Sequence, residues 1–252
     1  MNRSKLEYLN SWFGQYSKDF LSGNPQVDVN IQFKIDHTFR VRTNILDIAA
    51  SLDLNPNDRR IAEVIGLLHD IGRFEQFVKY GTFRDDISED HAELGLNVLK
   101  KLQILNDLPE EEKNIVEFSI KYHNKFMLPQ LESADCLVFG KLIRDADKLD
   151  ILGQLVCEVS QNDSTGDECS AEVINLIFSG EVVSFTSLKM PGDINLMRMS
   201  WILDVNYSLT LKKIMDKQIL ERLVVKLLQT EEIKKVYAYL KSYMERRIDL
   251  GN

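Results

Sequence analysis

Residues that break helices or make turns are scarce in this chain, which has 12 glycines and 5 prolines among 252 residues. A sandwich or barrel of many short strands needs frequent turns, so this scarcity disfavours both architectures. Leucine, lysine and glutamate are abundant, and these residues favour long helices. We therefore predict an all-α fold, with a single helical domain and a C-terminal helical extension.

Cysteines and long apolar runs are also rare. Cys136, Cys157 and Cys169 are odd in number and form no Cys-x-x-Cys pair, so neither a disulfide framework nor a thiolate zinc site is indicated. No stretch approaches the roughly 20 apolar residues that span a bilayer, and Met1–Phe20 lacks the apolar segment of a signal peptide. We expect a protein of the reducing cytoplasm that does not insert into a membrane.

The chain has no excess of positive charge. It contains 31 basic and 39 acidic residues, which gives a formal net charge of −8. This charge repels the polyanionic backbone of nucleic acids, so we expect no long nucleic acid as a partner. A small anionic substrate is compatible with it if a metal ion supplies positive charge locally.

Helix-starting and helix-ending residues divide the chain into segments. Gly72 is interpreted as a stop, followed by a loop over residues 73–87. Residues 181–188 alternate in polarity and are compatible with an extended segment. The predicted helices cover residues 4–21, 28–52, 56–70, 88–102, 109–124, 133–160, 168–178, 193–228 and 231–248.

The chain has four histidines, and each lies on the predicted interior face of a different helix or at a helix end. They are His37, His69, His91 and His123. A single histidine on an apolar face is most often a core residue with hydrogen-bonded ring nitrogens. That interpretation weakens when all four are taken together, because each buried imidazole then needs a partner of its own.

Two acidic residues also fall on apolar faces. Asp70 lies near the end of Ile61–Ile71, which has almost no polar face, and Asp147 lies four residues from both Ile143 and Ile151. A buried carboxylate is costly unless it is paired, hydrogen-bonded or metal-bound. Ion pairs with neighbouring basic residues would satisfy either acid alone, whereas one metal centre would satisfy the acids and the histidines together.

The order and spacing of these residues resemble the pattern of the HD-domain superfamily of metal-dependent phosphohydrolases, over about Lys34 to Leu152. The resemblance rests on His37, on the pair His69-Asp70, and on Asp147 within Arg144-Asp145-Ala146-Asp147-Lys148-Leu149-Asp150. His91 and His123 resemble the two extra histidines of the binuclear members of that superfamily.

We predict an N-terminal helix over residues 1–27, a metal-binding helical core over 28–160, and a C-terminal extension over 161–252 packed on the core, and the resemblance has no counterpart for the stretch after about Gln161. The resemblance implies an all-helical fold for the part that it covers. It also implies two divalent transition-metal ions that share Asp70. One ion is held by His37, His69, Asp70 and Asp147, and the other by Asp70, His91 and His123. Ligands rich in imidazole favour Fe, Mn, Co, Ni or Zn over Mg or Ca, and we predict Fe or Mn.

The resemblance further implies an enzyme that hydrolyses a phosphate ester, such as a nucleotide or another small phosphorylated substrate, with a metal-bridging hydroxide as nucleophile. Asp70, Arg73 and Lys148 are then the catalytic residues. Arg73 and Lys148 lie beside the implied ligands, and we hypothesise that they bind phosphate oxygens, with a surface ion pair as the alternative for each. Tyr80 and Arg84 lie in the predicted loop, for which substrate contact and an ordinary solvated connection both stay open.

Two other functions stay open on the same residues. A di-iron oxygenase uses the same six ligand positions in some members of the superfamily, and a non-catalytic metal- or nucleotide-sensing module needs only binding. Cyclic-dinucleotide hydrolysis is disfavoured, because the Gly-Tyr-Pro signature is absent and Asn124 follows His123 where that subfamily has a second histidine. Alarmone hydrolysis stays open.

Overall fold

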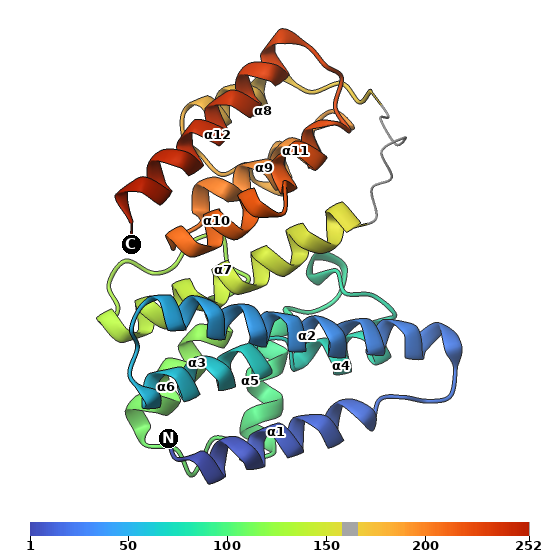
Figure 1. Ribbon diagram of the computed structural model, residues 1–252. Helices are drawn as coiled ribbons and strands as arrows, with labels where there is room; N and C mark the ends of the chain where they lie inside the picture. The colour runs from blue at the N-terminus through green and yellow to red at the C-terminus, as the bar shows by residue number, and fades with distance from the viewer. Residues whose placement is uncertain (158–165, 252) are drawn as a thin grey trace. The chain divides into compact units, whose positions relative to one another are not determined.

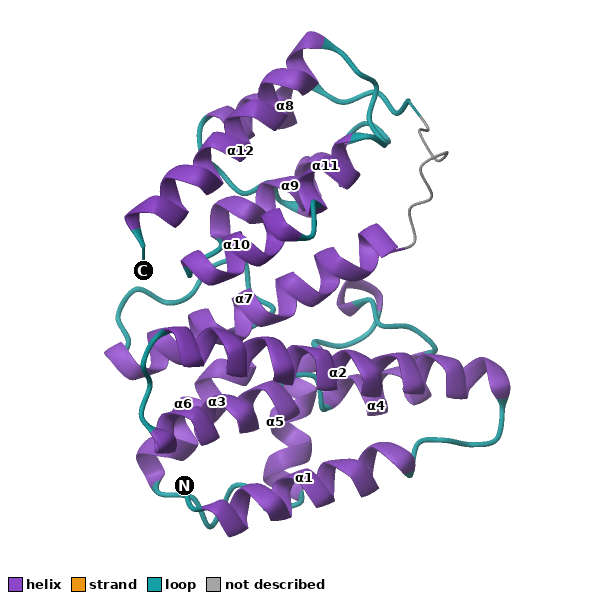
Figure 2. Cartoon of the chain, in the orientation of Figure 1, coloured by secondary structure: helices purple, strands orange, loops and turns teal. Residues whose placement is uncertain are grey.

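The computed structural model describes residues 1–157 and 166–251, and over these residues the chain is built from helices joined by loops (Figure 2). The described residues contain no strand, and an isolated bridge between Asp167 and Leu227 is the β pairing found among them. The predicted all-α fold class is confirmed. The chain divides into two compact units, Met1–Asp147 and Lys148–Asn252. The predicted division at residues 27/28 and 160/161 stays a prediction.

The first unit holds seven α-helices or parts of them and one 3₁₀ turn among its described residues (blue to green in Figure 1). Helix α3 packs against α1, α2 and α6, and α5 packs against α4 and α6. Their bounds are α1 Arg3–Lys18, α2 Pro25–Ser51, α3 Pro56–Leu68, α4 Gly72–Tyr80, η1 Asp85–Ile87, α5 His91–Lys101, α6 Glu110–Tyr122 and the first part of α7 Ala134–Cys157.

Asparagine caps set where the first helices begin. The Asn24 side chain accepts a hydrogen bond from the backbone N–H of Gln26, and Asn55 accepts two from the first turn of α3. A proline follows each of these asparagines, where its missing N–H costs nothing and its fixed φ suits the first turn. The pair Asn55-Pro56 therefore starts α3 at residue 56, where the predicted helix over 56–70 begins, and α3 leads directly to His69.

The predicted stop at Gly72 is wrong, because Gly72 is the first residue of α4. A Cβ atom at this position would lie 2.2 Å from the carbonyl oxygen of His91 and 2.5 Å from the backbone nitrogen of Gly95. The glycine therefore permits close packing of α4 against α5 and does not end a helix. The predicted loop over residues 73–87 is correspondingly too long, since Tyr80 is still helical and the chain turns only at Gly81, with φ of 66°.

The second unit is described by the remainder of α7, by several short helices and by one long C-terminal helix, around a core of aliphatic side chains. The predicted single helix over 193–228 is wrong. The backbone is extended at Val205 and left-handed at Gln218, with φ of 52°, so the chain turns twice and each short helix buries its own apolar residues. The elements are α8 Ala171–Phe178, η2 Phe185–Ser187, α9 Asp193–Ser200, η3 Trp201–Asp204, α10 Ser208–Asp216, α11 Ile219–Val224 and α12 Glu231–Leu250.

The predicted extended segment over residues 181–188 is only partly formed, since the backbone is extended at Ser184 and Leu188 but turns between them, and no strand pairs there. The backbone N–H of Val183 donates to the hydroxyl of Ser200 at 2.9 Å, and a 3₁₀ turn follows. A side chain thus satisfies the amide that a strand would have paired. No helix within the described part of the chain has the length and apolar character to cross a membrane.

Candidate metal centre

Three helix ends and the middle of α2 bring the four histidines of the first unit to one place. His37 lies within α2, His69 directly follows α3, His91 begins α5 and His123 directly follows α6. All four side chains are buried, and Asp70 lies buried among them. The sequence pattern had placed them on interior faces, and the fold now places those faces together.

The two oxygens of Asp70 face different histidines. Oδ1 lies 3.2 Å from Nε2 of His91 and 3.6 Å from Nε2 of His123. Oδ2 lies 3.4 Å from Nε2 of His37 and 3.7 Å from Nε2 of His69. One carboxylate therefore stands between two pairs of imidazoles.

We call His37, His69 and Asp147 the first histidine group, and His91 with His123 the second histidine group. In the first group, Oδ1 of Asp147 lies 3.2 Å from Nε2 of His37 and 3.9 Å from Nε2 of His69. In the second group, the two Nε2 atoms are 2.9 Å apart. Each histidine pair forms with Asp70 a set of ligand atoms close enough to hold a metal ion.

Hydrogen bonds on the far side of three rings indicate which nitrogen carries the proton. Nδ1 of His69 lies 2.9 Å from the carbonyl oxygen of Gly66, and Nδ1 of His123 lies 2.7 Å from that of Ile120. Nδ1 of His91 lies 2.7 Å from Oδ2 of Asp85. Since these oxygens only accept, each Nδ1 donates and each Nε2 of a neutral ring keeps its lone pair.

Lone pairs from several imidazoles and from carboxylate oxygens thus converge at both groups. Electron-pair donors that face one another at 3 to 4 Å repel unless a cation or a proton lies between them. Histidines whose Nδ1 is anchored to a carbonyl or a carboxylate are the usual form of metal-ligating histidine. The residues present therefore fit divalent metal ions.

The charges of the cluster agree with this. Burial lowers the pKa of His69 to about 4, although Asp70 and Asp147 oppose the shift, so its ring is neutral at pH 7. Burial alone would raise the pKa of Asp70, but the ammonium of Lys34 and the neighbouring imidazoles hold it well below its usual range. Neutral imidazole and ionised carboxylate are the forms that bind metal.

Lys34 was not predicted from the sequence to be a residue of the site. Its Nζ lies 2.7 Å from Oδ2 of Asp70 and 5.4 Å from the centroid of the Phe83 ring. The available signal was its position three residues before His37 on one helix, which puts both side chains on one face. Lys34 adds a cation to the first histidine group.

Arg73 lies beside Asp70 and is also tied to the chain that follows it. Its Nε lies 3.6 Å from Oδ1 of Asp70, and Nη1 donates to Asp85 Oδ1 at 2.7 Å and to Gln76 Oε1 at 2.8 Å. Asp85 and the fully buried Gln76 were not singled out in the sequence. No motif marks Gln76, which lies where a solvated loop was predicted.

The other predicted substrate-binding residues have acidic partners elsewhere. Tyr80 donates its hydroxyl to Glu89 at 3.1 Å, and Arg84 pairs with Asp86 at 2.6 Å on the surface. Lys148 belongs to the second unit, where its ammonium pairs with Asp204. Their roles toward a substrate stay predictions.

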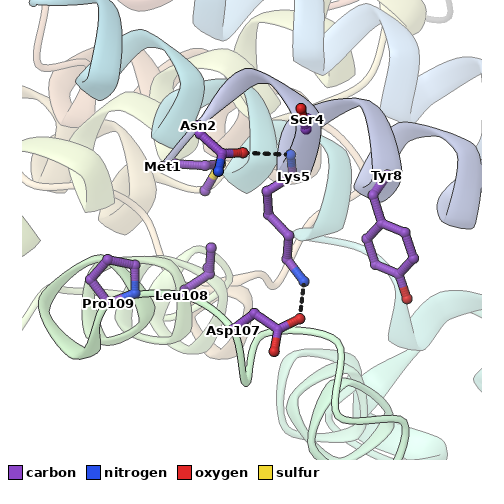
Figure 3. Close-up of a pocket in the computed structure, with 8 residues that line it drawn as sticks. All are labelled: Met1, Asn2, Ser4, Lys5, Tyr8, Asp107, Leu108 and Pro109. Atoms are coloured by element: carbon purple, nitrogen blue, oxygen red, sulfur yellow. Dashed lines mark hydrogen bonds and ion pairs between the residues drawn. The ribbon is translucent and has the colours of Figure 1, made fainter.

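A separate pocket of about 520 Å³ lies between the start of α1 and the turn before α6 (Figure 3). Lys5 crosses it to Asp107, with 3.3 Å between Nζ and Oδ2. None of the predicted site residues lines it. Its lining consists of Met1, Asn2, Ser4, Lys5, Tyr8, Asp107, Leu108 and Pro109.

Comparison with known families gives one finding. Residues 35–152 match the family model of the HD domain, and this range contains all six predicted metal ligands. Comparisons with curated proteins and with solved structures gave no match. The chain therefore carries an HD domain over residues 35–152, as the order of its histidines and aspartates indicated.

Proposed function

We propose that this protein is a phosphohydrolase that uses two divalent transition-metal ions, Fe or Mn, to hydrolyse a small phosphate ester. Two findings support the proposal. HD domains occur mostly in metal-dependent phosphohydrolases, and the buried histidines and aspartates of this one could hold metal. Imidazole-rich ligation favours Fe or Mn over Mg or Ca.

The position of Asp70 carries the proposal. Its two oxygens lie within 3.7 Å of an Nε2 atom from each of four histidines, so this carboxylate is suited to be shared by two ions. Two metal ions sharing a carboxylate supply an activated water at neutral pH and positive charge for the attacking and leaving oxygens of a phosphoryl transfer. A nucleotide is one such substrate.

The cations around Asp70 suggest how the chain receives the phosphate. Lys34 and Arg73 both lie within 3.6 Å of its carboxylate. A phosphate bound beside Asp70 would therefore lie near an ammonium and a guanidinium. These two groups neutralise the charge of phosphate oxygens and fix their orientation. We assign this role first to Lys34 and Arg73, and keep Lys148, Tyr80 and Arg84 as further substrate-binding residues of the hypothesis.

The decisive experiment is metal content per chain after anaerobic purification without chelators, for the wild type and for Asp70→Ala. About two equivalents of Fe or Mn are expected in the wild type and nearly none in the variant, because both groups lose their shared ligand. Asp107→Ala is the control, since Asp107 is exposed and pairs with Lys5 at the separate pocket. A wild type without metal, or an unchanged Asp70→Ala, would contradict the proposal.

Activity then separates the functions that share these ligands. Release of phosphate from nucleotides and other phosphate esters, lost in Asp70→Ala and kept in Asp107→Ala, is expected. Oxygen uptake with a carbon substrate would favour the di-iron oxygenase instead. Tight nucleotide binding without turnover, with any of several metals, would favour a sensing module.

A further inference from the structure

Asp85 connects two parts of the site that the proposed function treats separately. Its Oδ1 accepts hydrogen bonds from Arg73 Nη1 at 2.7 Å and from Gln76 Nε2 at 2.8 Å. Its Oδ2 accepts from His91 Nδ1 at 2.7 Å and from Asn124 Nδ2 at 3.3 Å. One carboxylate therefore joins a phosphate-binding candidate to a metal-ligand candidate.

Asp85 lies in the loop over residues 81–90 between α4 and α5, and the same partners hold that loop. Gln76 Nε2 also lies 2.9 Å from the Ser88 hydroxyl and 2.8 Å from the Glu89 carbonyl oxygen. Arg73 Nη1 donates to the carbonyl oxygen of Phe83. The loop is thus fixed at its beginning, middle and end by two side chains of α4.

The support of His91 differs from that of the other histidines whose Nδ1 partner is known. His69 and His123 each donate to a backbone carbonyl three residues earlier, so their tautomers depend only on their own helix. His91 is the first residue of α5, where no preceding helical carbonyl exists, and it depends on Asp85.

We propose that Asp85 is a positioning residue that fixes His91 with Nε2 as the metal-binding nitrogen, and that it thereby couples metal binding at the second histidine group to the order of loop 81–90. This inference rests on the proposed function, because it requires that the second group binds metal. With a metal ion bound at Nε2, the His91 ring would be a stronger donor through Nδ1–H to Asp85, and Asp85 would then hold the loop more tightly. The ordered loop in turn holds Arg73 where phosphate would bind.

The test compares wild type, Asp85→Ala, Asp85→Asn and Asp86→Ala by Mn²⁺ titration under anaerobic conditions. Asp86 is the matched control, since it is the next residue in the same loop and its partner is Arg84. Wild type and Asp86→Ala should bind two ions per chain. In Asp85→Ala the second ion should bind about 10- to 100-fold more weakly, which is the usual effect of removing such a partner. The first ion should be unaffected.

Two readouts separate positioning from a general loss of structure. Electron paramagnetic resonance should show coupled Mn²⁺ pairs in the wild type and isolated Mn²⁺ in Asp85→Ala. Hydrogen exchange of residues 81–90 should slow on adding Mn²⁺ in the wild type and in Asp86→Ala but not in Asp85→Ala. Asp85→Asn keeps the size of the side chain and one accepting oxygen, so it should fold and show an intermediate loss.

The outcomes distinguish this inference from the proposed function. If the wild type binds two ions and both Asp85 variants bind the second with unchanged affinity, Asp85 is not a positioning residue, while the two-metal proposal stands. If the wild type binds no Mn²⁺ and no Fe, both proposals fall. If Asp85→Ala does not fold, Asp85→Asn alone decides.

Discussion

The two histidine groups share Asp70 but are built differently. The first group has a second carboxylate, Asp147, facing both of its imidazoles. The second group has no such carboxylate on its Nε2 side among the described contacts, and His91 depends on a loop side chain for its orientation. The first group therefore follows from helix packing alone, whereas the second also needs the loop.

The imidazoles of the two groups do not differ in their access to solvent. The side chains of His37 and His69 are 3% and 0% exposed, and those of His91 and His123 are both 2% exposed. The difference lies in the carboxylates that support them, since Asp147 faces the Nε2 atoms of the first group whereas Asp85 contacts Nδ1 of His91 from the loop.

The largest difference between the two groups is expected when one histidine is removed from each. His123→Ala leaves only His91 and Asp70 at the second group, so about one of two Mn²⁺ ions should be lost and excess metal should not restore turnover. His37→Ala leaves His69, Asp70 and Asp147, so its ion should weaken but return at high Mn²⁺ together with activity. Metal titrations followed by phosphate release measure both.

That experiment tests whether the two groups differ in metal affinity after each loses one histidine. Equal losses and equal recovery in His37→Ala and His123→Ala would mean that Asp147 adds nothing to the first group. Thermal unfolding of both variants shows whether either loss comes from unfolding of the domain.

A smaller effect is expected from the titration of His69 in the metal-free, chelated protein. The pKa of this buried ring is lowered to about 4 from an ordinary value of 6.5. Between these values the unfolded chain binds a proton that the folded chain does not, so stability falls as the pH drops from 6.5 to 4 and is independent of this group above 6.5. At about 1.4 kcal/mol per pKa unit, the folded state should lose roughly 3 kcal/mol over that range.

Urea unfolding at pH 7, 6, 5 and 4 measures this loss. His69→Gln is the control, since glutamine does not titrate and the corresponding slope should disappear. Asp70 and Asp147 add to the slope only near pH 4, because their pKa values are lowered in the folded state and the unfolded chain protonates these groups only as the pH approaches the ordinary value of 3.8. A wild type with flat stability between pH 6.5 and 4 would contradict the assignment of a neutral His69.

The sequence sufficed for the fold class and for the first approximation of the site. Few glycines and prolines predicted helices, and a histidine or aspartate on an apolar face predicted a buried group in need of partners. The six residues chosen in this way do lie together. The prediction succeeded because a charged side chain or an imidazole on the apolar face of a helix can be recognised from the helical pattern alone, even when its partner is distant in the sequence.

The supporting residues could not be found in the same way. Gln76 and Asp85 lie in a segment interpreted as a solvated loop, where polar residues carry no signal. Lys34 lies on a helix whose polar face is crowded with charge, so its contact with Asp70 depends on the packing of α2 against α4. Gly72 was interpreted as a helix stop because glycine often ends helices. In the structure the backbone of α5, which is distant in the sequence, leaves no room for a Cβ atom at this position.

That misinterpretation gives the last and smallest prediction. Gly72→Ala would place a Cβ atom 2.2 Å from the carbonyl oxygen of His91, so α4 and α5 must separate. We expect a loss of about 1–3 kcal/mol in urea unfolding and weaker metal binding at the second histidine group, with the first unchanged. Gly14→Ala is the matched control, because α1 has open space there and alanine should stabilise that helix by about 0.5–1 kcal/mol. Equal effects of the two substitutions would mean that the close approach of α4 and α5 does not hold His91 in place.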